Sequence, residues 1–307
     1  EPGTHFVYNT AASYVLSAIV QRFTGQNVLD YLSPRVLEPL GITGATSQRS
    51  PQGIDTGGWG MSVTTEDIAA FGLLYLHDGV WDGRRLLPEG WVEQATAAQV
   101  PTGVPSSGDD WVQGYGFQFW RCVGGYFRGD GAFGQFCVVV PQADLVVAIT
   151  SGTATMGASL AAIRELLLPG LHDEPVAADP AGRDELVGRL ASMRLDPPAG
   201  VPVTDTGGRV SGRTVAFGDA MAATFVAGEQ SDEIALTWAD GSATLRAGHD
   251  EPVAQLLPTP PGRLADPSPT PALVSGTWPA PDVYVLSVRY VETPFVWTVT
   301  AHVDGDT

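Results

Sequence analysis

The spacing of apolar residues changes near residue 114, and this change constrains the fold of the 307-residue chain more than any other feature. Before it, apolar residues recur with the period of an amphipathic helix; after it, short runs of β-branched and aromatic residues predict strands. A further helix is predicted at 156–168. Helices on either side of an antiparallel meander predict an α+β fold. The clearest elements are helices at 11–24, 28–37, 65–79 and 88–97 and strands at 115–120, 136–140 and 145–149. The apolar face of the first helix would carry Val15, Leu16, Ile19, Val20 and Phe23.

A linker is expected to divide the chain into two parts. Residues 169–181 contain Pro and acidic residues and are typical of a linker, so 169–200 is interpreted as a linker with one short helix. The α+β part is then 1–168, and 201–307 is predicted to be a small β-rich domain. Its expected strands are 209–217, 234–238, 243–247, 284–291 and 295–303, and 258–271 is expected to be a loop.

Composition excludes several classes of function. The formal net charge is −18, so the basic surface that nucleic acid requires is missing and no nucleic-acid partner is expected. There is no apolar run of 18 residues, so no membrane span is expected. All 16 basic residues are Arg, which leaves no lysine for a Schiff base, a P-loop or a Ser-x-x-Lys pair.

Metal and cofactor chemistry find no support in the sequence. The 5 histidines are scattered without ligand spacing. No Gly-x-Gly-x-x-Gly joins a strand to a helix, and no Gly-x-Ser-x-Gly elbow is present, so neither a dinucleotide nor an α/β-hydrolase site is expected. Cys122 and Cys137 are more easily explained as two buried thiols than as one disulfide between neighbouring strands, although both interpretations stay open.

Three motifs in order resemble one family. Tyr8-Asn9-Thr10 leads into the first helix, a glycine-rich turn occupies 57–60, and Gly129-Asp130-Gly131-Ala132-Phe133-Gly134-Gln135 precedes a strand. In this order they resemble the class C β-lactamase and penicillin-binding-protein-like serine hydrolases, in the esterase and oligomer-hydrolase branch. The resemblance covers residues 1 to about 168. It implies a β-lactamase/transpeptidase-like antiparallel sheet with flanking helices, followed by a small all-β domain.

The resemblance also implies roles for individual residues. Tyr8 would hydrogen-bond the nucleophilic serine and pass on its proton, and the backbone N–H of Ala132 would bind the oxyanion. These roles fit the nucleophile, base and oxyanion donor that acyl transfer requires. The residues expected to line the substrate site are Asn9, Trp59, Gly131 and Asp130.

The family's nucleophile motif, Ser-x-x-Lys, lies many tens of residues before the Tyr motif, whereas Tyr8 is the eighth residue here. Since the chain has no lysine, we expect it to be the C-terminal part of a larger domain, with the missing N-terminal segment as its partner. Such a part is expected to be inactive alone. The resemblance also makes a secreted or cell-envelope location more plausible than a cytoplasmic one.

The charge of Asp130 affects which substrates are expected. Many β-lactamases carry lysine in the third motif, where it helps to hold the substrate's carboxylate. The sequence alone favours Asp130 as a solvated loop acid, which would repel a carboxylate. An ester or a small amide is therefore the expected substrate, with β-lactams cleaved weakly. The alternative is a catalytically inactive binding module that lacks the nucleophile.

Overall fold

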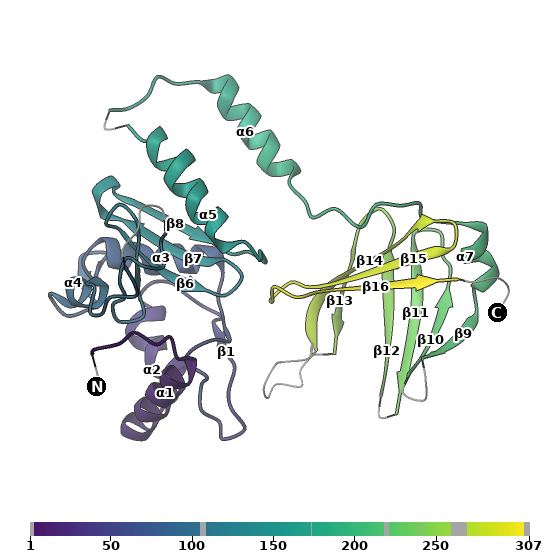
Figure 1. The fold of residues 1–307 in the computed structure, drawn as a ribbon, viewed down its shortest axis with the longest axis horizontal. Helices are drawn as coiled ribbons and strands as arrows, with labels where there is room; N and C mark the ends of the chain where they lie inside the picture. The colour runs from purple at the N-terminus through teal and green to yellow at the C-terminus, as the bar shows by residue number, and fades with distance from the viewer. Residues whose placement is uncertain are drawn as a thin grey trace. The chain divides into compact units, whose positions relative to one another are not determined.

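The computed structural model describes residues 3–104, 109–172, 174–217, 221–239, 241–258 and 269–303. It divides into two compact units, with the change from the first to the second between Asp173 and Glu174 (Figure 1). Within the described parts of the chain, no helix is long and apolar enough to cross a membrane. The two units are described separately.

The first unit has the predicted α+β architecture, built on a four-stranded antiparallel sheet in the order β5-β6-β7-β8. The predicted helices at 11–24 and 65–79 are present, and β7 and β8 match the predicted strands. The predicted strand at 115–120 is reduced to its last residue. Helices of the unit are α1 (Thr10–Thr24), α2 (Val28–Leu32), α3 (Thr65–Leu76), α4 (Trp91–Thr96) and α5 (Met156–Ala162), the second and last extended by π-helical turns at Ser33–Leu37 and Ile163–Leu167. Its strands are β1 (Thr46–Ser47), β2 (Met61–Ser62), β3 (Val80–Trp81), β4 (Arg84–Arg85), β5 (Trp120–Arg121), β6 (Phe127–Gly131), β7 (Gln135–Val140) and β8 (Leu145–Ile149).

Alternation along β7 gives the sheet two apolar faces. On one face Cys137 and Val139 pack with Tyr75 of α3, and on the other Phe136 and Val138 pack with Leu160 of α5. The second core also contains Cys122, so the two cysteines lie in different cores. Both are free thiols, which excludes the disulfide. Burial raises the pKa of the Cys122 thiol to about 11 and that of Cys137 to about 12, so neither is activated as a nucleophile.

Gly72 allows α3 to approach the sheet closely. A Cβ at this position would lie 2.6 Å from Val146 Cγ1 and 2.9 Å from Cys137 Sγ, both side chains of the packed sheet. We therefore expect Gly72→Ala to lower the free energy of unfolding by about 1–3 kcal/mol through overpacking, despite a helix-propensity gain of about 1 kcal/mol. Urea denaturation measures this. Gly188→Ala is the matched control, because Gly188 is also in a helix but nothing lies within 4 Å of its Cβ position. Stabilisation by both changes would contradict the prediction.

The predicted apolar face of α1 is not covered in the described part of the chain. The helix begins at the Asn9 cap and ends at Gly25 in the left-handed conformation, as its sequence predicts. However, four apolar side chains of this helix are 44–83% exposed. They are Val15, Leu16, Ile19 and Phe23. Helical periodicity predicts which residues share a face, but not what packs against that face.

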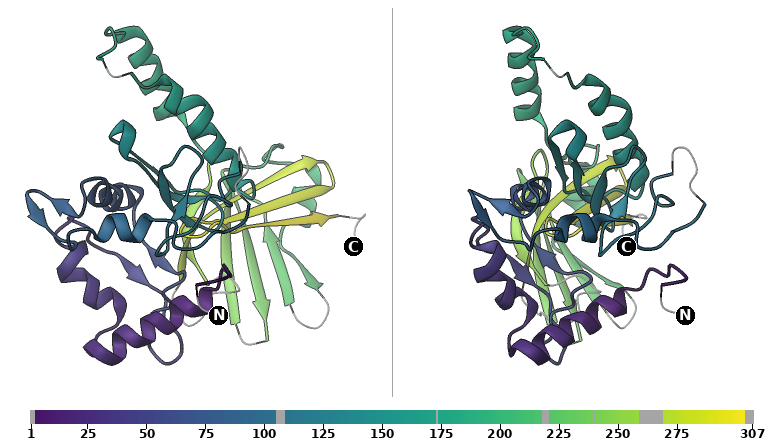
Figure 2. Two further views of the ribbon diagram at one scale, coloured as in Figure 1. Left: turned by 60° about the vertical axis from the view of Figure 1, so that its left-hand side comes forward. Right: turned by 90° about the vertical axis from the view of Figure 1, so that its left-hand side faces the viewer.

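The second unit contains an eight-stranded sheet in the order β16-β15-β14-β12-β11-β10-β9, with β13 paired to β14. The sheet is curled, as Figure 2 shows. This confirms the predicted β-rich domain. Residues 209 and 210, predicted as strand, end a helix, and residues 259–268 of the predicted loop lie outside the described residues. The elements are α6 (Pro180–Ser192), α7 (Asp205–Val210), β9 (Arg213–Phe217), β10 (Met221–Val226), β11 (Ser231–Trp238), β12 (Gly241–Gly248), β13 (Val253–Leu257), β14 (Thr270–Ala280), β15 (Val283–Tyr290) and β16 (Val296–His302).

A buried polar cluster lies inside this sheet. The Tyr284 hydroxyl donates to Asp232 Oδ2 at 2.9 Å, and His249 Nε2 lies 3.0 Å from the same oxygen. The Gly228 N–H donates to the other carboxylate oxygen at 3.2 Å. Burial and the adjacent Asp232 carboxylate raise the pKa of Tyr284 above its ordinary value of 10.0.

This cluster predicts alkaline instability of the second unit. Above pH 10 the unfolded chain releases the Tyr284 proton while the folded chain keeps it. The unfolded state then binds fewer protons, so stability falls as pH rises, by about 1.4 kcal/mol per pH unit. We expect Tyr284→Phe to flatten this slope in urea denaturation between pH 10 and pH 11, both values set by the ordinary phenol pKa. Tyr31→Phe, a change in the first unit, should not alter it. Equal slopes for Tyr284→Phe and the unmodified protein would contradict the assignment.

Candidate active site

Tyr8 lies on a cluster of aromatic rings at the start of α1. Its ring is stacked on Trp120 at 6.1 Å and meets Tyr115 edge-on at 6.3 Å between centroids. The Phe6 ring contacts the Tyr115 ring at 5.1 Å and the Trp120 ring at 5.5 Å between centroids. These four residues are called the aromatic cluster. Tyr8 is nevertheless 57% exposed, and no hydrogen bond of its hydroxyl is present among the described residues. The cluster therefore holds the ring and leaves the hydroxyl available.

Asn9 orients Tyr8 by capping α1. Its side-chain oxygen accepts from the Ala11 N–H at 3.0 Å, which satisfies one of the unpaired donors at the helix N-terminus. The Asn9 side chain thus has a structural partner, and its predicted substrate contact stays a prediction.

Residues 114–121 form a tight hairpin instead of the predicted strand. Tyr115 pairs with Trp120 across the hairpin, and Arg121 N–H donates to Gly114 O at 2.9 Å. This pairing brings the Tyr115 and Trp120 rings together at 4.8 Å, edge to face. The same hairpin positions Gln118 at its tip, where the amide Nε2 donates to Ser13 Oγ of α1 at 3.3 Å.

Trp59 lies on a glycine-rich loop that packs closely on α1. A Cβ at Gly57 would lie 2.8 Å from Ser13 O, and one at Gly58 would lie 2.5 Å from Thr10 Cγ2. Only glycine therefore permits this approach, which holds the loop beside the helix. Trp59 itself is 43% exposed and so is not a core residue. Its predicted place in the substrate site is compatible with that exposure and stays a prediction.

Gly131 is the last residue of β6, and Ala132 begins the turn that leads to β7. Gly134 N–H donates to Gly131 O at 3.2 Å and closes the turn, while Ser151 Oγ donates to the carbonyl oxygens of Phe133 and Gly134, each at 2.8 Å. Ala132 is exposed, and its N–H has no acceptor among the described residues. The Ala132 N–H is therefore available to a ligand, and its role as an oxyanion donor stays a prediction.

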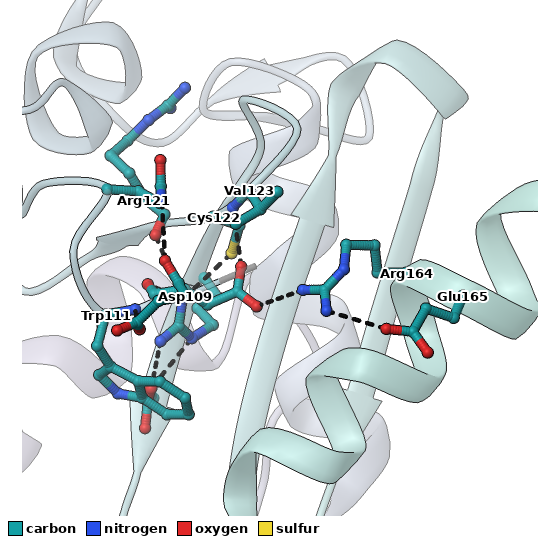
Figure 3. A network of polar contacts seen from close by, with 11 residues as sticks. Asp109, Trp111, Arg121, Cys122, Val123, Arg164 and Glu165 are labelled. Carbon is teal, nitrogen blue, oxygen red and sulfur yellow. Dashed lines mark hydrogen bonds and ion pairs between the residues drawn. The ribbon is translucent and has the colours of Figure 1, made fainter. Parts of the chain in front are cut away.

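Arg128 of β6 is fully buried and contacts Cys122 and Asp110, and Asp110 in turn pairs with Arg164. Figure 3 shows the network of polar contacts around Cys122 and Arg164. The Arg128 Nε donates to Asp130 Oδ2 at 3.0 Å, and Nη2 lies 2.9 Å from the same oxygen. Nη1 donates to the carbonyl oxygens of Asp110 at 3.2 Å and Arg121 at 3.3 Å. The guanidinium carbon lies 5.7 Å from the centre of the Trp120 ring.

The expectation that Asp130 is a solvated loop acid is wrong. Asp130 belongs to β6 and its side chain is only 6% exposed, because residues two apart in a strand share a face and Asp130 therefore meets the buried Arg128. Burial raises the pKa of Asp130, while Arg128 and a hydrogen bond from Trp111 oppose that rise. The paired charge gives no reason to exclude a substrate that carries a carboxylate. Substrate binding by Asp130 and by Gly131, which is partly buried, stays a prediction.

Tyr115 lies near both motifs of the predicted site, the one that contains Tyr8 and the one that contains Asp130 and Ala132. Burial raises its pKa to about 12, and the nearby Tyr8 and Asp130 add to the rise. The Tyr8 ring lies 6.1 Å from the Trp120 ring, and the guanidinium carbon of Arg128, which pairs with Asp130, lies 5.7 Å from the same ring. Ala132 follows Asp130 by two positions. The structure therefore brings the first and third motifs to the same end of the sheet.

A family model described as Beta-lactamase matches residues 1–168, more than half of the chain. The chain belongs to the beta-lactamase family. This confirms the family that the three motifs resemble, and with it a hydrolase fold.

Individual proteins of known name are also similar to this chain. A 6-aminohexanoate-dimer hydrolase of Paenarthrobacter ureafaciens is 30% identical over 148 residues, covering 46% of this chain and 38% of that protein. A Bacillus anthracis structure assigned as a 6-aminohexanoate-dimer hydrolase is 26% identical and covers 53% of this chain and 44% of its own, with a TM-score of 0.44. A penicillin-binding protein homologue from Pyrococcus abyssi, which is octameric, is 13% identical with a TM-score of 0.44, covering 94% of this chain and 64% of its own. The chain spans less than half the length of the two hydrolases it matches.

The sequence motifs do not identify several residues that surround the candidate site. The sequence pattern predicts that Tyr115, Gln118 and Trp120 share one strand, and it indicates no role for Arg128. The two glycines at 114 and 116 were a signal for the hairpin, because glycine inside a strand pattern indicates a bend. No local signal indicates that Arg128 is buried, since an arginine in an isolated strand is normally exposed.

Proposed function

We propose that this chain contributes to the acyl-transfer site of a serine hydrolase that cleaves an ester or a small amide. The observation that carries the proposal is the exposed Tyr8 on the aromatic cluster, at the sheet end where the Ala132 turn is also exposed. Tyr8 would receive and return the proton of the serine. The Ala132 N–H would stabilise the oxyanion, a contribution of about 3–4 kcal/mol for a donor of this kind.

The serine and its lysine are proposed to come from a segment outside these 307 residues, since the chain contains no lysine. The uncovered apolar face of α1 supports this, because such a segment would bury it. Positive charge from that lysine would favour the Tyr8 phenolate during proton transfer.

A linear amide is the proposed substrate. Two relatives are named as hydrolases of the 6-aminohexanoate dimer, which is a linear amide with charged ends. The pairing of Asp130 with Arg128 is compatible with a terminal carboxylate, because it removes the repulsion that a free acid would cause.

The test uses the full-length protein. A fluorophosphonate probe should label one serine, identified by peptide mass spectrometry, and the protein should hydrolyse 4-nitrophenyl acetate and the 6-aminohexanoate dimer. Labelling without amide hydrolysis would restrict the function to esters. Neither labelling nor hydrolysis would instead favour the non-catalytic binding module.

A further inference from the structure

Two residues of types that rarely adopt a positive φ do so in this structure, and both lie at the candidate site. Five described non-glycine residues have positive φ, and three of them are Asp, which tolerates this conformation. The other two are Gln118 at +67° and Phe133 at +65°. Phe133 follows Ala132 in the turn between β6 and β7, and Gln118 is at the tip of the hairpin formed by residues 114–121. Strained backbone of this kind persists where the surroundings require it, often at binding sites.

The surroundings of Gln118 hold its backbone firmly and its side chain loosely. Gly116 N–H donates to Phe119 O at 2.7 Å and Phe117 N–H donates to Ala95 O at 2.7 Å, so the hairpin tip is anchored on both sides of the strained residue. In contrast, the Gln118 amide makes two long bonds, 3.3 Å to Ser13 Oγ and 3.4 Å from the Tyr115 hydroxyl to Oε1. Bonds of this length are weak, and Gln118 is exposed. The amide can therefore exchange these partners for a ligand.

Both partners of the Gln118 amide are next to Tyr8. Ser13 lies in the first turn of α1, whose N-cap Asn9 directly follows Tyr8, and the Tyr115 ring contacts the Tyr8 ring. The amide presents a donor and an acceptor beside an exposed apolar ring, Phe117, which is 41% exposed. A linear amide needs such a combination, because its alkyl chain requires an apolar surface and its ends require hydrogen bonds.

We propose that the Gln118 carboxamide is a specificity-determining group that binds a polar end group of a linear amide substrate while the scissile bond lies at Tyr8. This inference rests on the proposed function and adds the residue that selects the substrate. Tyr115 and Ser13 hold the amide in place until substrate replaces one of them.

The test compares Gln118→Met with the unmodified full-length protein on two substrates. Methionine keeps the length of the side chain and removes both hydrogen-bonding groups. We expect KM for the 6-aminohexanoate dimer to rise about tenfold, the equivalent of one lost hydrogen bond. The parameters for 4-nitrophenyl acetate, which has no polar end group, should stay unchanged. Unchanged kinetics on the dimer, or equal losses on both substrates, would overturn the proposal.

A second variant separates backbone strain from substrate binding. Gln118→Gly relieves the positive φ, so it should raise the melting temperature and still raise KM for the dimer. Asp144→Gly is the matched control, since Asp144 has a φ of +48° at a turn between β7 and β8. It should leave both substrates unaffected. A Gln118→Gly variant with normal KM would assign Gln118 a structural role and overturn the proposal. Fluorophosphonate labelling of all variants keeps the two ideas distinguishable, because absent labelling of the unmodified protein rejects the serine hydrolase itself.

Discussion

Replacing Tyr8 with phenylalanine in the full-length protein is expected to lower kcat/KM for the 6-aminohexanoate dimer by about 10²- to 10⁴-fold, the usual contribution of a positioned acid–base group. The change removes only the hydroxyl. The ring would keep its contacts with Trp120 and Tyr115, so the aromatic cluster should stay intact. Initial-rate kinetics measure the loss, and most of it should fall on kcat, because proton transfer occurs in the reaction and not in binding.

The folded state should not change in Tyr8→Phe, since the described residues offer the hydroxyl no hydrogen bond that could be lost. A matching melting temperature would show this. Tyr14→Phe is the control on the same helix, where a hydroxyl that donates to Ser50 at 3.0 Å is removed. It should leave kcat unaffected. A decrease of only a few-fold in Tyr8→Phe would contradict the proton-transfer role.

Replacing Arg128 with methionine is expected to lower the free energy of unfolding of the first unit by about 3–5 kcal/mol. The variant leaves Asp130 buried at 6% exposure without its cationic partner. It also leaves the carbonyl oxygens of Asp110 and Arg121 without the Nη1 donor. Urea denaturation gives the energy, and hydrogen exchange at β6 and β7 would show that the loss is local to this sheet.

The chain contains a matched control for this prediction. Arg194 and Asp196 form a pair with the same spacing as Arg128 and Asp130, but their side chains are 68% and 78% exposed. Arg194→Met should therefore change stability by less than about 1 kcal/mol. The double change Arg128→Met with Asp130→Asn should recover part of the loss, because no unpaired charge stays buried. If the two arginine variants had equal effects, burial would not be the cause.

Most helices and the sheet of the first unit could be predicted because their signals are local. The Thr64 cap and the apolar residues that follow it define α3 within a single segment, and β7 and β8 are continuous apolar runs. In contrast, β6 contains Arg128, Asp130 and two glycines, which have low strand propensity. Pairing with β7 makes it a strand, so tertiary context overrides its local preference.

The residues of the candidate site also fall into those with a local sequence signal and those without one. The sequence by itself identified the Tyr8 and Ala132 motifs, because a motif is a short string of residues that can be compared directly. It also excluded lysine chemistry within the chain, because that requires only a count. It did not identify Gln118 or Arg128 as part of the site.

Only the tertiary structure decided which side chains surround Tyr8. Gln118 meets Ser13 across 105 residues of chain, and Tyr115 reaches the Tyr8 ring over a similar separation. The tertiary structure also shows that Asp130, expected to be a surface acid, is buried and forms an ion pair with Arg128. The physical reason is that periodicity and capping depend on neighbours within a few residues, whereas burial, ion pairing and ring contacts depend on segments that meet only when the whole sheet has formed.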